Sequence, residues 1–171
     1  RGETKLAMSV FTSRGCPFNC TFCSIHITMT RRWRARSPEN VCDEIEELIT
    51  KYGVEHIQFE DDNATLLPDR FEKIIDECKR RGLNFTFNFP NGVRADTLSE
   101  RLIKKFAEAG CTEIIVSPES GSQRVIDHVI GKRLIEEVEK GWAFGPIYRD
   151  CEIKPAELAD NVGIIGAAKV A

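Results

Sequence analysis

The chain has 171 residues, of which 42% are hydrophobic and 30% charged, and its net charge is −3. This is the composition of a soluble globular protein, and the length fits one sizeable domain. A charge so close to balance excludes a global attraction to nucleic acid or to an anionic membrane. No stretch approaches the roughly 18 apolar residues that span a bilayer, and residues 1–5 are not followed by a secretory core. We therefore expect a cytoplasmic protein with no membrane partner.

Helices are indicated where apolar residues recur at helical spacing, and each such segment ends at a glycine. The first is predicted over residues 37–52, with Ser37 as its N-cap and Gly53 as its end. The second carries apolar residues from 71 to 78 and ends at Gly82, and the third begins with a capping box from Thr97 to Glu100. The third helix ends at Gly110, so the glycines lie about 30 residues apart, which is the size of one strand-helix unit.

Short apolar strands fit the gaps between these helices. They are predicted over residues 6–11, 54–59, 84–89 and 113–117. Strands that alternate with helices imply right-handed crossovers and a parallel sheet. The fold class is therefore α/β, with the sheet either wound into a barrel or left open.

Every group that suggests chemistry follows a strand rather than preceding one. In parallel α/β folds, ligands bind at the carboxyl ends of the strands, so these groups are expected to converge on one rim. In chain order they are Cys16, Cys20 and Cys23, then Glu60, Asp61, Asp62 and Asn63, then Asn91 and Arg94, and finally Glu119.

Three of the seven cysteines lie close together, at the spacing C-x3-C-x2-C from Cys16 to Cys23. Three such thiolates can hold three irons of a cubane cluster and leave the fourth iron open for a ligand. An odd cysteine count fits a disulfide framework poorly. The four scattered cysteines are interpreted as small buried hydrophobic residues; they are Cys42, Cys78, Cys111 and Cys151.

Residues 13–23 closely resemble the signature loop of the radical S-adenosylmethionine (radical SAM) superfamily. The resemblance continues through residues 36–39, 59–62, 94–96 and 118–122, and it covers residues 6–132 in all. It is strongest to the branch whose members often carry a cobalamin-binding domain upstream. The family implies an incomplete (βα) partial barrel of the TIM type, of which about four strand-helix units are visible here.

The resemblance also implies a role for individual residues. Cys16, Cys20 and Cys23 would bind a 4Fe-4S cluster, and Phe22 would lie near the adenine of S-adenosylmethionine. Asp61 or Asp62 would meet the methionine amino group, while Arg94 and Glu119 would contact the ribose or the methionine moiety. In the family, the reduced cluster cleaves S-adenosylmethionine to a 5′-deoxyadenosyl radical that abstracts hydrogen from substrate. An electron donor such as flavodoxin or ferredoxin is implied, together with an unknown substrate and with cobalamin held by a domain absent from this chain.

Two alternatives remain open from the residues alone. The three cysteines together with His26 could form a tetrahedral zinc site, in a module that keeps the fold without catalysis. A non-enzymatic Fe-S module for electron transfer is the related possibility. The arginine-rich run at residues 31–36 resembles a nucleic-acid patch, but it is interpreted as a solvated loop because the chain as a whole is acidic.

The pattern changes beyond residue 132. Residues 1–132 are assigned to the radical SAM core, and residues 133–171 to an atypical tail that is similar to the C-terminal end of ROK-family sugar kinases and fits a fusion or frameshift. The superfamily core generally has six units, so the strand over residues 113–117 is expected to leave an open edge. The tail shows no alternating strand able to cover that edge.

Overall fold

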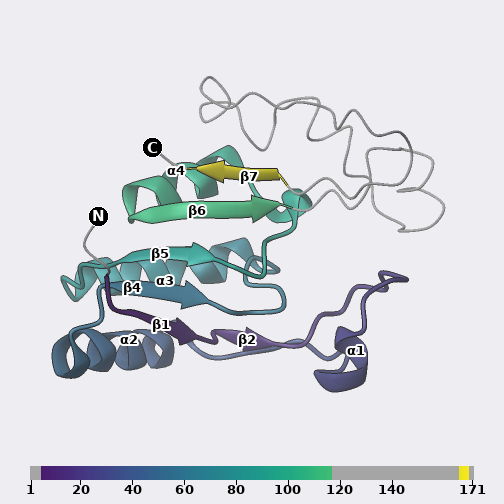
Figure 1. The fold of residues 1–171 in the computed structure, drawn as a ribbon, viewed down its shortest axis with the longest axis horizontal. Coiled ribbons are helices and arrows are strands. Elements are labelled where there is room, and N and C mark those ends of the chain that lie inside the picture. The colour runs from purple at the N-terminus through teal and green to yellow at the C-terminus, as the bar shows by residue number, and fades with distance from the viewer. Residues whose placement is uncertain (1–4, 117–165, 170–171) are drawn as a thin grey trace.

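The computed structural model describes residues 5–116 and 166–169. Its centre is a sheet in which four parallel strands lie side by side in the order β1-β4-β5-β6 (Figure 1). These strands are β1 (Ala7–Val10), β4 (His56–Phe59), β5 (Thr86–Phe89) and β6 (Cys111–Val116). Within the described ranges the sheet is open rather than closed into a barrel. The predicted α/β fold with an incomplete parallel sheet is confirmed.

A helix follows each of the first three parallel strands. They are α2 (Pro38–Tyr52), α3 (Pro68–Arg80) and α4 (Glu100–Glu108). The start of α2 is as predicted, because the Ser37 hydroxyl accepts a hydrogen bond from the Asn40 amide and Pro38 occupies the first turn. Gly53 ends the helix in the left-handed conformation, with φ of 68°. The helix of the expected fourth strand-helix unit would follow β6 and falls outside the described residues.

The capping box predicted for the third helix is wrong. The N-cap of α4 is Ser99, whose hydroxyl accepts a hydrogen bond from the Leu102 amide at 3.2 Å. Thr97 instead ends a short 3-10 helix, η1 (Ala95–Thr97), where its hydroxyl donates to the Arg94 carbonyl at 2.8 Å. Thr97 lies inside η1 and three residues before α4 begins at Glu100, so Ser99 and not Thr97 stands at the N-cap position.

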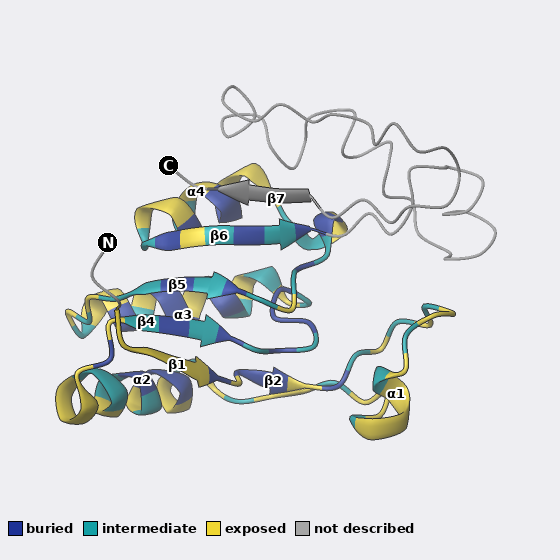
Figure 2. Ribbon diagram, viewed as in Figure 1, coloured by how far each residue is buried: buried dark blue, intermediate teal, exposed yellow. Residues whose placement is uncertain are grey.

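The helices pack on one face of the sheet, and this face forms the core. Five phenylalanine rings lie in mutual contact there, with centroid separations from 5.1 to 6.0 Å; they are Phe59, Phe71, Phe87, Phe89 and Phe106. In Figure 2, buried residues gather along β4, β5 and β6 and on the helix sides that face them. Side chains alternate along each strand, so the opposite face carries half-buried polar residues such as His56, Gln58 and Asn88.

The expectation of an open edge at β6 is also wrong. Strand β7 (Gly166–Lys169) pairs antiparallel with β6, in a register that runs from Glu113 opposite Lys169 to Val116 opposite Gly166. An edge strand offers unpaired backbone groups that any extended segment can satisfy, so a partner strand does not need an alternating apolar pattern. The sequence Gly-Ala-Ala-Lys has no such pattern, and pattern analysis therefore missed it.

Between β1 and α2 the chain leaves the sheet and makes a long excursion. A two-stranded antiparallel ribbon forms its base, from β2 (Ser13–Arg14) and β3 (Arg34–Ala35). The residues between the two strands carry the three clustered cysteines and one short helix, α1 (Ile25–Thr28). Figure 1 shows this segment extending past the carboxyl ends of β1 and β4. Among the described residues, no helix is long and apolar enough to cross a membrane.

Candidate functional site

The cysteine loop begins with a tight backbone approach. Gly15 has φ of 84°, and a Cβ at this position would lie 2.5 Å from the Arg32 carbonyl oxygen. A side chain is therefore excluded both by conformation and by space. The Cys16 amide donates to the Thr30 carbonyl at 3.4 Å, so the two ends of the loop lie side by side. Cys16, Cys20 and Cys23 are half-buried free thiols on this loop.

The loop is joined to the segment that follows β4 by two adjacent carboxylates. Asp61 accepts hydrogen bonds from the Thr12 amide at 3.1 Å and the Thr12 hydroxyl at 2.9 Å, and a third from the Ser13 hydroxyl. Asp62 accepts one from the Gly15 amide at 2.7 Å. These bonds hold the entry to the cysteine loop against the carboxyl end of the sheet.

The two carboxylates differ in their freedom to bind anything else. Asp61 is 1% exposed, and its two oxygens already accept three hydrogen bonds. Asp62 is half-buried, and one of its oxygens accepts the bond from the Gly15 amide. Sequence analysis treated them as interchangeable, but the structure gives Asp61 a structural position and leaves Asp62 nearer to solvent.

A half-buried arginine, Arg70, supports the same backbone segment as Asp61. Arg70, from α3, donates to the Thr12 carbonyl at 2.6 Å and to the Arg36 carbonyl at 2.7 Å. Burial lowers the pKa of the Arg70 guanidinium, and the nearby Asp61 carboxylate acts in the opposite direction. Arg70 was not singled out from the sequence, because a lone arginine on an amphipathic helix resembles an ordinary surface residue.

Asn63 reaches the first cysteine from the same segment. Its side-chain amide nitrogen lies 3.9 Å from the Cys16 sulfur, within range of a weak N–H···S hydrogen bond. The residue is 2% exposed, and its amide oxygen is buried without a hydrogen-bond partner among the described residues. A buried acceptor left unpaired is costly, which makes this oxygen a candidate contact for a bound group.

The segment after β5 joins the same rim. The Asn91 side chain donates to the Glu60 carbonyl at 2.9 Å, and the Arg94 guanidinium lies 3.6 Å from the centre of the Phe18 ring, inside the cysteine loop. Arg94 also forms an ion pair with Asp96. Three of the four post-strand segments predicted to converge therefore do so. The fourth, with Glu119, lies outside the described residues.

Two further candidates, Phe22 and His26, lie on the cysteine loop itself. Phe22 lies on the cysteine loop and is 55% exposed. His26, the fourth ligand of the zinc alternative, is exposed, and its Nδ1 atom lies 3.0 Å from the Cys23 carbonyl oxygen. In the part of the chain that the structure describes, no three His, Cys, Asp or Glu side chains form a ready-made metal-binding group.

The arginine-rich run is not simply a solvated loop. Arg31 donates to the Phe18 carbonyl at 2.7 Å, which ties the far side of the cysteine loop to this run. Arg36 is half-buried, donates to the Phe11 carbonyl at 2.9 Å and pairs with Glu44 on α2. Arg31 is exposed, as a solvated loop requires, whereas Arg36 is half-buried, so the solvated-loop interpretation is wrong for Arg36 and not for Arg31. Their positive charge is used to hold backbone carbonyls in place.

The sequence-family model of the radical SAM superfamily matches residues 10–143. This range includes the cysteine loop and all three described rim segments. The chain belongs to the radical SAM superfamily. Curated radical SAM relatives include an uncharacterised methyltransferase of Pyrococcus horikoshii, 37% identical over 80% of this chain and 30% of the relative. A cytidylyl-2-hydroxyethylphosphonate methyltransferase of Streptomyces wedmorensis is 34% identical over 73% of this chain and 23% of its own length.

A third relative has a different reaction in its name. The anaerobic magnesium-protoporphyrin IX monomethyl ester cyclase of Rubrivivax gelatinosus is 30% identical over 73% of this chain and 22% of that protein. The chain thus spans less than a third of the length of these curated relatives.

Solved structures of radical SAM proteins share the fold. The cobalamin-dependent radical enzyme OxsB, with aqua-cobalamin and S-adenosylmethionine bound, gives a TM-score of 0.67 at 24% identity, over 77% of this chain and 21% of that one. The methyltransferase TsrM of Kitasatospora setae, with tryptophan and a S-adenosylmethionine analogue bound, gives 0.66 at 18% identity, over 80% and 27%. At these identities the likeness shows a common fold.

The donor set fits the iron-sulfur cluster of this superfamily. Three free thiols lie on one loop, and one of them already has an N–H donor from a neighbouring side chain. A cubane takes each thiolate on a different iron, and hydrogen bonds to its sulfurs adjust its reduction potential. The three thiols therefore have the chemistry that such a cluster requires, and all three lie on one loop.

Proposed function

We propose that this chain is the cofactor-binding core of a radical SAM enzyme, in which Cys16, Cys20 and Cys23 hold a 4Fe-4S cluster. When bound, the cluster supplies the electron that cleaves S-adenosylmethionine to a 5′-deoxyadenosyl radical, which abstracts hydrogen from substrate. The observation that carries the proposal is the convergence of the cysteine loop with the rim after β4, through the Gly15–Asp62 and Cys16–Asn63 contacts. A structural metal module would not need carboxylates beside its thiols.

The structure favours a division of labour between the two carboxylates. Asp62 is the better candidate for the methionine amino group, because a carboxylate with spare acceptor capacity can take a charge-assisted hydrogen bond. Asp61 holds the backbone that positions the loop, since its oxygens are already engaged with Thr12 and Ser13. The unpaired oxygen of Asn63 offers a second acceptor beside Cys16.

Other contacts to S-adenosylmethionine are proposed from the family pattern. Phe22, whose side chain is 55% exposed, would lie near the adenine, because an aromatic ring can stack on it. Arg94 and Glu119 would contact the ribose or methionine moiety. For Arg94 this requires the guanidinium to share its charge between Asp96 and the cofactor, because that pairing is already present.

The relatives differ in the reaction that their names give, methyl transfer in two and ring formation in the third. The part that this chain shares with all of them is therefore proposed to be the common cofactor core. The whole protein would act on a substrate selected by other segments. It would take electrons from a donor such as flavodoxin or ferredoxin in the cytoplasm, and cobalamin would bind outside these residues.

The test is anaerobic reconstitution of the full chain with iron and sulfide, followed by reduction in the presence of S-adenosylmethionine. We expect about four irons per chain and the appearance of 5′-deoxyadenosine. Cys16→Ala, Cys20→Ala and Cys23→Ala should each remove most of the bound iron. The matched control is Cys111→Ala, a buried thiol on β6 away from the loop, which should keep it.

Equal iron loss in the control and the loop variants would refute the ligand assignment. Zinc found as the sole metal after anaerobic preparation would favour the non-catalytic metal module instead. A full iron-sulfur complement with no 5′-deoxyadenosine would favour the electron-transfer module.

A further inference from the structure

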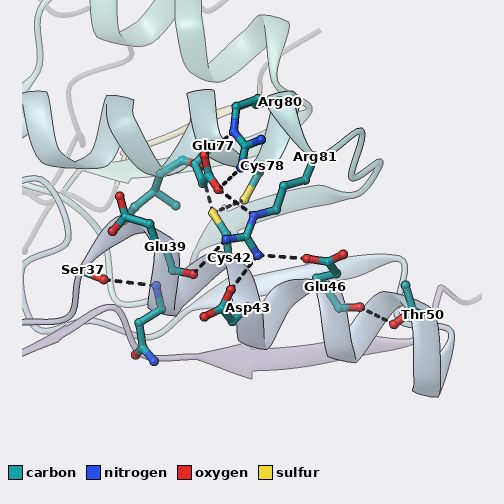
Figure 3. A network of polar contacts seen from close by, with 12 residues as sticks. Ser37, Glu39, Cys42, Asp43, Glu46, Thr50, Glu77, Cys78, Arg80 and Arg81 are labelled. Atoms are coloured by element: carbon teal, nitrogen blue, oxygen red, sulfur yellow. Dashed lines mark hydrogen bonds and ion pairs between the residues drawn. The ribbon is translucent and has the colours of Figure 1, made fainter.

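Two cysteines outside the cofactor site face each other between α2 and α3. Cys42 is 0% exposed and Cys78 is 3% exposed, and their sulfur atoms lie 2.9 Å apart (Figure 3). They are 36 positions apart in the sequence. Both were predicted from the sequence to be small buried hydrophobic residues, but a pattern along one helix carries no information about which thiol on another helix it meets.

The separation of the two sulfurs is the decisive observation. It is well below an ordinary non-bonded contact between sulfur atoms and less than 1 Å longer than the roughly 2.05 Å of a disulfide. The Cys42 thiol also lies 3.4 Å from the Ile74 carbonyl, one helical turn before Cys78, so both sulfurs occupy the same gap between the helices. Bond formation requires the two sulfurs to come closer by less than about 1 Å.

The surrounding charges hold the two helices in this register. Arg81, just after α3, forms ion pairs at 2.7 Å with Asp43 and at 2.9 Å with Glu46, both on α2. It also pairs with Glu77 on α3 at 2.7 Å. Figure 3 shows the arginine reaching from α3 across to these acidic residues beside the two thiols. The cysteines are thus held opposite each other by contacts that do not involve sulfur.

The two thiols are chemically unequal. The hydrogen bond from Cys78 lowers the pKa of Cys42, and the Arg81 charge acts in the same direction against the effect of burial. The pKa of Cys78 is raised by the same hydrogen bond and by burial. Cys42 is therefore the thiol that becomes the nucleophilic thiolate.

We propose that Cys42 and Cys78 are a disulfide-forming pair that cross-links α2 to α3 when the protein meets a small-molecule disulfide. The Cys42 thiolate attacks the sulfur-sulfur bond of the oxidant and releases one small thiol. The Cys78 thiolate then attacks the mixed disulfide at the Cys42 sulfur, and the second small thiol leaves. The protein loses two hydrogens, which end on the two small thiols.

Access for the oxidant comes from the end of a helix. Cys78 lies in the last turn of α3, which ends at Arg80, and terminal turns open more readily than helix centres. Because the Cys42 sulfur lies against Cys78, such an opening also uncovers the attacking thiolate. The segment closed by the cross-link contains β4 and both rim carboxylates, Asp61 and Asp62. The disulfide therefore fixes the frame that carries one side of the candidate site, without using any of its three clustered thiols.

The experiment treats the folded, cluster-free full chain with oxidised glutathione, blocks the remaining thiols after unfolding, and maps the peptides by mass spectrometry. We expect a peptide pair joined through residues 42 and 78, with the mass of two hydrogens lost and full reversal by dithiothreitol. The melting temperature of the cross-linked protein should rise by about 5 to 15 °C, because the bond constrains the unfolded chain. The same result is expected in a Cys16→Ser, Cys20→Ser, Cys23→Ser background, which removes competition from the loop.

Cys42→Ser should abolish both the cross-link and the rise in melting temperature, whereas Cys111→Ser, a matched buried cysteine whose sulfur contacts the Glu113 carbonyl, should leave both intact. The proposal fails if Cys42 and Cys78 remain separately blocked in oxidised protein that still melts cooperatively. It also fails if the pair joins only after denaturation. Neither outcome depends on the cluster, so the proposed function and this cross-link are tested separately.

Discussion

The helix-covered sheet and the cysteine loop are held together by different forces. Between the sheet and its helices, the side chains of Phe71, Phe87 and Phe106 are at most 1% exposed and their rings pack against one another. In the loop, Phe22 and Ile27 are 55% and 74% exposed, and α1 contains no buried residue. The loop is held by hydrogen bonds to backbone groups at its two sides. Apolar packing therefore builds the frame, and polar anchoring places the chemistry on it.

This difference predicts that stability and cofactor binding respond to different substitutions. A change in the frame should lower the free energy of unfolding and affect the site only through the fold. A change in the exposed part of the loop should leave unfolding nearly untouched. Substitutions at three places probe this separation, in order of decreasing effect on stability: the phenylalanine cluster, the two rim carboxylates and Glu77.

The largest effect is expected from Phe71→Ala in α3. This ring contacts Phe59, Phe89 and Phe106, so truncation leaves a cavity at the centre of the cluster. The free energy of unfolding should fall by about 3 to 5 kcal/mol, measured by urea denaturation of the cluster-free chain. The matched control is Phe22→Ala, an aromatic residue on the exposed loop, which should change it by less than about 0.5 kcal/mol. Similar losses from both changes would remove the distinction between frame and loop.

Sequence periodicity predicted the frame because burial on one face forces a repeating pattern on helices and strands. The ends of α2 were predicted to the residue, since Ser37 and Gly53 act through local geometry alone. The start of α4 was missed because two hydroxyls, Thr97 and Ser99, both had the right chemistry. The structure separates them by position, since Thr97 lies in η1 and Ser99 directly precedes α4.

The location of the candidate site on the rim was predicted from the sequence, but its supports were not, and the assignment of the three cysteines as cluster ligands stays a prediction. The three cysteines and the rim carboxylates follow strands, and parallel topology brings such positions together. The supports depend on pairings across the fold that leave no pattern along the chain. Examples are Arg70 with the Thr12 carbonyl, Asn63 with Cys16, and Cys42 with Cys78.

An intermediate loss in the free energy of unfolding is expected at Asp61, and a smaller one at the adjacent Asp62. Asp61→Asn replaces an acceptor-only group that faces three donors, and one amide hydrogen then points at a donor. We expect a loss of about 1 to 3 kcal/mol in the free energy of unfolding, by urea denaturation. Asp62→Asn keeps an oxygen for the Gly15 amide, so unfolding should change by less than about 1 kcal/mol.

For the affinity for S-adenosylmethionine, the order of the two residues should be reversed, with the larger effect at Asp62. In the reconstituted protein, Asp62→Asn removes the carboxylate proposed to meet the methionine amino group. Loss of a charge-assisted hydrogen bond of about 1.5 to 3 kcal/mol weakens binding by about 10- to 150-fold, measured by calorimetry. An Asp62→Asn protein with unchanged affinity would place the amino group elsewhere on the rim.

The smallest effect is a pH dependence confined to the frame. The Glu77 carboxylate accepts hydrogen bonds from Arg80 at 2.7 Å and from Arg81 at 2.7 Å, and these bonds hold its pKa at about 2, below the usual 4.5. A carboxylate with a lowered pKa in the folded state stabilises the protein fully above the unfolded pKa. That contribution is lost as the pH falls from about 4.5 to about 2.

Glu77→Gln should therefore flatten the fall in melting temperature over this range, so that the two proteins differ most near neutral pH and converge near pH 2. The Arg81 pairs with Asp43 and Glu46 remain in the variant, which keeps α2 and α3 in register. A constant offset between the two melting curves at every pH would mean that Glu77 acts by packing rather than by charge.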